Sequence, residues 1–96
     1  MLKILIKPRA KEDLKNIYLY SLKEFGKTKT TEYVGDLDKA FNKLANNCNL
    51  GNDYSVISPQ TRAYKATSHL IFYKISEDQI SIIRVLHKSM DHKKHL

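Results

Sequence analysis

The stretch from Ser68 to Asp91, SHLIFYKISEDQISIIRVLHKSMD, constrains the fold more than any other part of the chain. It contains an apolar and aromatic run, Leu70 to Ile75, then the polar residues 76–79, then a run rich in β-branched residues, Ile80 to Leu86. Two such runs around a short polar break predict a β-hairpin. A four-residue connection is expected, because the Asn-Gly or Asp-Gly pair of a two-residue turn is missing. A hairpin this apolar is not stable alone in water, so another part of the chain must cover one face.

Two segments upstream have the periodicity of amphipathic helices and are the candidates for this cover. The first helix is predicted over Arg9–Glu24, and Gly26 is placed to end it, since glycine adopts the left-handed conformation without a Cβ penalty. The second is predicted from Lys27–Thr31 to about Asn47, with Thr28 or Thr30 as its cap. The expected buried stripes are Ala10, Leu14, Ile17, Ser21 and Phe25 in the first helix, and Val34, Leu37, Phe41, Leu44 and Cys48 in the second.

A short Gly-containing connection between two helices of similar length predicts an antiparallel helical hairpin. Gly35 weakens the second helix by about 1 kcal/mol relative to alanine, and a close crossing of the two helices is one reason for it to be there. Further strands are predicted over Leu2–Ile6 and Thr61–Thr67, with a loop over Asn46–Gln60. The predicted fold is therefore α+β, in the order β-α-α-β-β-β, with the helical hairpin packed on a small, mainly antiparallel sheet.

The size and charge of the chain limit its function. Its 96 residues form one domain, residues 1–96, and its formal net charge of +7 predicts attraction to nucleic acid, an acidic protein or an anionic membrane. One cysteine, Cys48, cannot form an internal disulfide, which fits a reducing compartment. The N-terminal run MLKILIKPR is too short and too charged for a signal peptide or a membrane span. We therefore expect a cytoplasmic protein without a membrane partner.

Several residues near the predicted sheet are candidates for chemistry. Cleavage of RNA without metal needs a general base, a general acid and a cation, and the basic candidates are Arg62, Lys65, His69, Lys74, Arg84 and His87. Strand alternation puts Arg84 with Ile82 and Leu86, and His87 on the opposite face, so the two are not expected to converge. No acidic residue lies within a predicted strand. The simpler interpretation is that these residues form a solvated or partner-facing surface.

No cofactor or metal is predicted. The C-terminal residues His87, Asp91, His92 and His95 do not form a four-ligand framework. The chain has no Gly-rich phosphate loop, no CxxC pair and no Ser-His-Asp order. Cys48 lies on an apolar stripe, which indicates a buried, inert thiol. Pairs of aromatic residues, Tyr18/Tyr20 and Phe72/Tyr73, are able to stack on bases, but packing in the core or at its rim is the commoner role.

Several motifs resemble those of the ParE branch of the RelE/ParE toxin superfamily, from bacterial type II toxin–antitoxin modules. Residues 10–18 are similar to the family's A-x-x-D-L-x-x-I opening of the first helix, and Phe25-Gly26 stands where the family usually has Trp-Gly. Residues 41–45 match the end of the second helix, and Leu50-Gly51 matches P-x-L-G with Cys48 in place of the proline. The most specific matches are Arg62 and the patterns H-x-I-F-Y over 69–73 and I-x-R-[IV]-L-H-x-x-M-D over 82–91.

The resemblance implies a toxin that acts as a poison of DNA gyrase, blocks replication without acting as an enzyme, and is neutralised by a cognate antitoxin in a hetero-oligomer. The alternative is a relative of RelE, a ribosome-dependent mRNA endonuclease with Arg62, Arg84 and His87 as its catalytic residues. A third possibility is a basic interaction module, such as an inactive toxin remnant that still binds its antitoxin.

The resemblance also implies binding residues. The target-binding residues carried over from the C-terminal motif are Arg84, His87, Lys88, Met90 and Asp91. The simpler interpretation of Met90 is that it fixes the C-terminal tail to the core, and for Asp91 it is a turn or cap partner. A disordered acidic antitoxin segment is expected to fold over the groove between the two helices and the sheet, with Tyr18, Leu22 and Tyr73 as the expected contacts.

Overall fold

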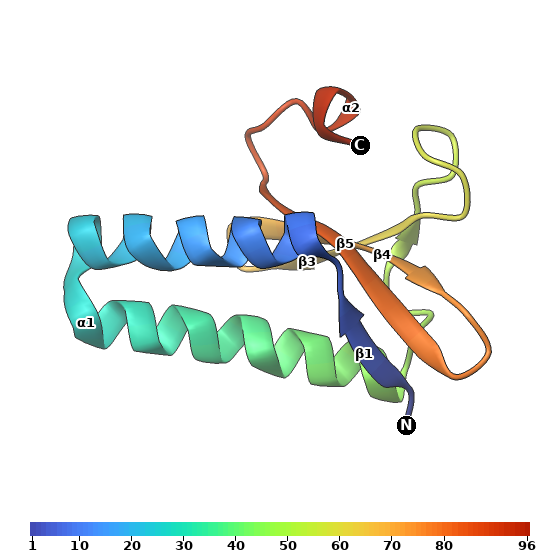
Figure 1. Ribbon diagram of the computed structural model, residues 1–96, viewed down its shortest axis with the longest axis horizontal. Helices are drawn as coiled ribbons and strands as arrows, with labels where there is room; N and C mark the ends of the chain where they lie inside the picture. Colours follow the sequence, from blue (N-terminus) through green and yellow to red (C-terminus); the bar gives the residue numbers. More distant parts are fainter.

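The computed structural model describes all residues from 1 to 96 and shows a helical hairpin packed on one face of a five-stranded sheet (Figure 1). The elements, in chain order, are β1 (Lys3–Ile6), α1 (Pro8–Asn46), β2 (Asn52–Asp53), β3 (Arg62–Ala66), β4 (His69–Ile75), β5 (Gln79–His87) and α2 (His92–His95). This arrangement confirms the predicted α+β fold. Two elements were not predicted: the two-residue strand β2 within the expected loop, and the C-terminal turn of helix α2.

The helical hairpin forms because α1 is broken at Gly26, as predicted. Gly26 has φ 83° and ψ 177°, and its neighbours are helical on both sides. We call residues 8–25 the first arm and residues 27–46 the second arm; they run antiparallel in Figure 1. Thr30 was expected as a possible cap, but its buried hydroxyl is hydrogen-bonded to the Ser21 hydroxyl of the other arm and to the Gly26 carbonyl, each at 2.8 Å. Thr30 therefore ties the arms together beside the break.

The sheet has the strand order β1-β5-β4-β3-β2, in which β1 runs parallel to β5 and all other neighbours are antiparallel. The pairing of β4 with β5 contains a bulge, since Phe72 pairs with Arg84 while the next residue, Tyr73, pairs with Ile82. A bulge inserts one unpaired residue and changes which face the following side chains occupy. The alternation predicted for β5 is therefore wrong at Ile82, which does not share a face with Arg84, but it holds from Arg84 to His87.

Apolar side chains cover both faces of the sheet. The larger cluster lies between the sheet and the two arms and includes Ala10, Leu37, Phe41, Leu44, Ile71, Tyr73, Ile80, Ile82 and Val85. We call the face of the sheet that packs against α1 the inner face. A smaller cluster of Ala63, Phe72 and Leu86 lies on the other, outer face, with Tyr54, Leu70 and Leu96 packed against it.

The helical hairpin is longer than the sheet beneath it, and its tip at Gly26 extends past the strands (Figure 1). Two stripe residues near the tip are consequently exposed, Phe25 at 60% and Val34 at 39%, although both were predicted to be buried. Gly35 also lies in open space: a Cβ there would have no neighbour within 4 Å, so the expected close crossing of the arms does not occur at this position. Neither α1 nor α2 carries an apolar run that would reach across a lipid bilayer.

Candidate functional site

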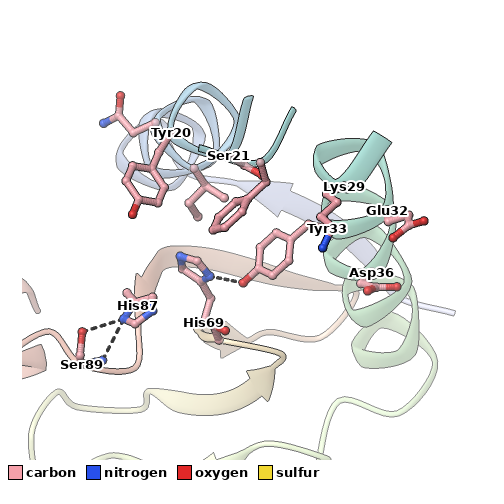
Figure 2. Close-up of a pocket in the computed structure, with 13 residues that line it drawn as sticks. Tyr20, Ser21, Lys29, Glu32, Tyr33, Asp36, His69, His87 and Ser89 are labelled. Atoms are coloured by element: carbon pink, nitrogen blue, oxygen red, sulfur yellow. Dashed lines mark hydrogen bonds between the residues drawn. The ribbon is translucent and has the colours of Figure 1, made fainter. Parts of the chain in front are cut away.

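The projecting tip of the helical hairpin leaves a cleft of about 860 Å³ between the two arms and the adjacent end of the sheet. The cleft opens beside Tyr20 and Phe25 of the first arm, and its floor carries residues from the start of β4 and the end of β5 (Figure 2). Its lining is Asn16, Ile17, Tyr20, Ser21, Phe25, Lys29, Glu32, Tyr33, Asp36, Ser68, His69, His87 and Ser89. Only four of these are hydrophobic, so the cleft offers hydrogen-bonding groups beside aromatic rings.

Four polar side chains meet on the floor of the cleft. His69 and His87 pair directly across β4 and β5, and their ring centroids are 5.3 Å apart with the planes at 89°. Figure 2 shows the phenol of Tyr33 reaching from the second arm to Nδ1 of His69, to which it is hydrogen-bonded. His87 Nδ1 is 2.7 Å from the hydroxyl of Ser89. The two histidines are therefore oriented by different partners, one from a helix and one from the chain just beyond β5.

Burial determines the charge of the His69 ring. Burial, and after it the neighbouring charge of His87, lower the pKa of His69 from its ordinary 6.5 to about 4, with Asp13 acting in the opposite direction. Taking an imidazolium out of water costs free energy, so the neutral ring is favoured. His69 is consequently neutral near pH 7 and presents one donor and one acceptor in the cleft.

Arg84 lies in a different environment, although it is only three residues from His87. Its Nε and Nη2 donate to the two oxygens of Asp13, at 2.7 and 2.9 Å, and its Nη1 donates to the carbonyl of His95, at 2.9 Å. The side chain of Arg84 is 10% exposed and that of Asp13 is 13% exposed. The hydrogen bonds to Asp13 raise the pKa of Arg84, while burial opposes them. The guanidinium is thus charged, and each of its three nitrogens donates a hydrogen bond within the protein.

The position of Asp13 follows from the way β1 ends. β1 pairs with β5 as far as Ile82, and Lys7 donates its backbone N–H to the Ile82 carbonyl before Pro8 starts α1. The edge of β5 beyond Ile82 consequently has no strand beside it. Asp13, in the second turn of α1, accepts the N–H of Val85 at 3.0 Å. One carboxylate therefore satisfies a buried backbone donor and neutralises Arg84.

The three residues of the nuclease alternative do not meet. Arg84 is paired with Asp13, and His87 lines the cleft on the inner face. Arg62 lies in β3, which is separated from β5 by β4. There it donates to the carbonyls of Asn49 and Gly51 and so holds the loop before β2. The expectation that Arg84 and His87 do not converge is therefore confirmed, because the pairing from Arg84 to His87 is regular and puts them on opposite faces of β5.

The predicted antitoxin contacts differ in accessibility. Tyr18 is 45% exposed and Leu22 is half-buried, so both are accessible on the first arm. Tyr73 is fully buried: its hydroxyl donates to the Cys48 carbonyl at 2.7 Å and accepts the N–H of Gly51 at 2.9 Å. The prediction of Tyr73 as an antitoxin contact is therefore corrected, because its side chain is part of the core. Cys48 itself is half-buried against that core.

The remaining C-terminal motif residues form an exposed run after β5. Lys88 and Asp91 are exposed, and Met90 is 37% exposed. Asp91 caps α2 by accepting the N–H of Lys93, which is the cap role considered for it from the sequence. No three His, Cys, Asp or Glu side chains gather in a group able to hold a metal ion.

Two residues of this region were missed by reasoning from the sequence. Tyr33 precedes an apolar stripe residue and carries no motif, so nothing local marks it as a partner of His69. Asp13 did carry a signal, because it is the acidic residue of the A-x-x-D-L motif and lies on the helix between Ala10 and Leu14. Its partner Arg84 is 71 residues away, so the pairing becomes visible only when the sheet and helix are assembled.

A family model that matches nearly the whole chain shows which family the chain belongs to. The family model described as the ParE toxin of the type II toxin–antitoxin system, parDE, matches residues 4–92. The chain belongs to this family. Toxin ParE1 of Caulobacter vibrioides is 32% identical over 88 residues, which cover 92% of this chain and 91% of the relative. Toxin ParE1 of Mycobacterium tuberculosis is also 32% identical over 88 residues, covering 91% and 90%.

Solved structures agree with this at the level of the fold. The chromosomal ParDE toxin–antitoxin system from P. aeruginosa contains a chain that superposes with a TM-score of 0.78 at 20% identity, covering 91% of this ParE-family chain and 96% of that one. A chain of the YoeB–YefM complex from Staphylococcus aureus superposes with a TM-score of 0.59 at 17% identity, covering 91% and 97%. The ParE-family chain thus has the fold found in both toxin–antitoxin systems.

Proposed function

We propose that this ParE-family toxin inhibits DNA gyrase, thereby blocking replication, and that a cognate antitoxin binds and neutralises it. The observation that supports a non-enzymatic toxin is the engagement of Arg84. A phosphodiester-cleaving site needs a cation free to stabilise charge on the phosphate. Each of the three guanidinium nitrogens of Arg84 donates to Asp13 or to the C-terminal tail, and Arg62 holds a loop elsewhere. In this proposal the toxin acts by binding its target.

The proposed target surface is the exposed run after β5, comprising His87, Lys88, Met90 and Asp91. Lys88 and the overall charge of +7 suit a target that carries DNA. Arg84 was predicted as a member of this surface, but its buried side chain places it behind the surface. Its proposed role is to support the tail from within the protein.

The proposed antitoxin site is the cleft together with the exposed part of the first arm. Tyr20 and Phe25 project at its rim, with 63% and 60% exposed, and Tyr18 lies nearby in sequence. Aromatic side chains of this kind are the usual anchors of protein–protein contacts. An acidic, disordered antitoxin segment would gain from the basic charge of the toxin and would order as it binds. The toxin and antitoxin are thus proposed to form a hetero-oligomer.

A supercoiling assay with purified gyrase and no ribosomes tests the proposal. We expect added toxin to raise the amount of cleaved DNA, and purified antitoxin to abolish the effect. The double variant Lys88→Ala/Met90→Ala should need at least about tenfold more toxin for the same effect, since about 1.4 kcal/mol of lost contact corresponds to a factor of ten. Lys74→Ala is the matched control, because it removes a lysine from β4, away from this run.

Two outcomes would contradict the proposal. If cleaved DNA does not rise and mRNA is cut in a translation extract, the toxin is the ribosome-dependent nuclease, and variants of Arg62, Arg84 and His87 should then lose cutting. If neither target is affected while the antitoxin still binds, the chain is an interaction module without toxic activity.

A further inference from the structure

The C-terminal tail, residues 88–96, folds back against the outer face of the sheet. The ring of His92 lies edge-on to Phe72 and Tyr54, with centroids 5.2 and 6.4 Å away, and Leu96 packs against the cluster of Phe72, Ala63 and Leu86. Figure 1 shows α2 returning above the sheet after the chain has left β5. Phe72 is fully buried although it faces away from the helical hairpin, because loop and tail residues cover it.

Few interactions within the tail stabilise the position of its last residues on the sheet. α2 has four residues, and so short a helix does not form in isolation, since nucleation costs more than one turn returns. Two of the polar contacts that attach the tail to the sheet and loop are long: His92 Nε2 to the His87 carbonyl at 3.3 Å, and the Tyr54 hydroxyl to His92 Nδ1 at 3.4 Å. Lys88, at the start of the tail, donates its backbone N–H to the Ser68 carbonyl at 2.9 Å. Farther along the tail, the short hydrogen bond is the one from Arg84 to the His95 carbonyl, at 2.9 Å.

That hydrogen bond depends on Asp13. The carboxylate holds two nitrogens of the Arg84 guanidinium, and a planar fork bound on one edge has its remaining N–H groups fixed in direction. The third nitrogen then points at the tail. Asp13 is itself fixed, because the same carboxylate accepts the N–H of Val85 in β5. A continuous chain of contacts thus runs from the first arm through the edge of β5 to the C-terminus.

We propose that Asp13 is a positioning residue of the toxin: by orienting Arg84, it clamps the C-terminal tail in the conformation that engages the toxin's target. The inference rests on the proposed target surface, whose residues Lys88, Met90 and Asp91 lie between β5 and the clamped end of the tail. Losing the clamp frees the tail at one end, so its target-binding residues have to be ordered at the moment of binding. That ordering costs conformational entropy and weakens the interaction.

The test compares Asp13→Asn with Glu12→Gln. Asp13→Asn keeps the size of the side chain but removes the charge and one of the two acceptors of Arg84. Glu12→Gln removes a negative charge from the neighbouring, exposed residue, which acts on Arg84 through its charge and not through a hydrogen bond, so the pair of variants separates the two effects. The first readout is the NMR signals of the His92 ring and the Leu96 methyl groups, which we expect the nearby ring of Phe72 to shift in the wild type. In Asp13→Asn these signals should move to their positions in a free peptide, and in Glu12→Gln they should stay.

The second readout is the concentration of toxin needed to raise cleaved DNA in the gyrase assay, and the third is antitoxin affinity. Asp13→Asn should need at least tenfold more toxin while binding the antitoxin as the wild type does, because Asp13 does not line the cleft. Arg84→Lys serves as a second variant if Asp13→Asn does not fold. Lysine keeps a charge beside Asp13 but has no second nitrogen to reach the His95 carbonyl, so the same two losses are expected.

The outcomes separate this inference from the proposed function. If the tail signals of Asp13→Asn, or of Arg84→Lys in its place, stay at their wild-type positions, Asp13 and Arg84 do not clamp the tail. If the tail is released but inhibition of gyrase is unchanged, Asp13 has a structural role only. If wild-type toxin does not affect gyrase, the proposed target is wrong, and Asp13 has no role in binding that target. The NMR result still decides whether Asp13 holds the tail.

Discussion

Arg84 and His87 belong to one strand and one sequence motif, yet they serve two regions with opposite properties. Around Arg84, which we call the clamp, a buried arginine, a carboxylate, a backbone N–H and a tail carbonyl satisfy one another. Around His87, the cleft is open, and its two histidines are half-buried, each with one residue as its side-chain hydrogen-bond partner. The difference shows that a basic residue in a motif supports the fold when it is saturated by internal partners, and is available to another molecule when it is not.

The largest expected effect is in the clamp. Asp13→Ala leaves the buried Arg84 charge without its partner and the Val85 N–H without an acceptor, so we expect the free energy of unfolding to fall by about 3 kcal/mol, the cost typical of breaking a buried ion pair from one side. Urea denaturation followed by circular dichroism measures it. Glu12→Ala, on the exposed neighbouring position, should change stability by less than about 0.5 kcal/mol.

A small loss of stability in Asp13→Ala would contradict the contrast between the clamp and the cleft. A loss within the range of a surface ion pair, about 0–1 kcal/mol, would mean that water replaces Asp13 at little cost. The clamp would then be no more essential to the fold than the cleft.

A smaller effect is expected in the cleft, and it depends on pH. The pKa of His69 is lowered from 6.5 to about 4 by burial and by His87. Between these two values the unfolded chain binds a proton at this site and the folded chain does not, so stability rises with pH in this window and is lost as pH falls from 6.5 towards 4. Thermal unfolding at a series of pH values, with EDTA present, measures the slope.

The matched variants isolate the contribution of His69. His69→Gln should flatten the part of the slope that arises between pH 6.5 and 4, whereas His95→Gln, in the C-terminal turn, should retain it. An equal slope in wild type and His69→Gln would show that the ring is as well hydrated in the folded protein as in the unfolded chain. The floor of the cleft would then be more open than its geometry indicates.

The smallest expected effect on stability is that of His87→Gln. The side chain is half-buried, and its hydrogen bonds are to Ser89, two residues away. We therefore expect the free energy of unfolding to change by less than about 0.5 kcal/mol, measured by the same urea titration. This variant tests whether the clamp and the cleft are independent, because His87 is only three residues from Arg84. A loss of stability as large as that of Asp13→Ala would show that the two regions are one structural unit.

Much of the architecture was predictable from local pattern. The apolar runs on either side of residues 76–79 predicted β4 and β5, and the helical stripes with Gly26 between them predicted the two arms of α1. The site was less predictable for particular reasons. Phe25 and Val34 have the spacing of buried residues, but the arms are longer than the sheet, so these positions have no strand to pack against. Tyr73 looked like a surface aromatic because the sequence does not show that Cys48 and Gly51 would supply partners for its hydroxyl.

Local features of the chain were enough to predict most of its elements and its family, because hydrophobic periodicity, a helix-breaking glycine and motif residues can all be recognised without the fold. Which motif residues are free could be seen only in the assembled fold. A single unpaired residue in β5 reversed the face of the strand between Ile82 and Arg84, and the early end of β1 left a backbone donor that Asp13 reached from α1. Both depend on which strands become neighbours, and that is settled by packing between parts of the chain far apart in sequence.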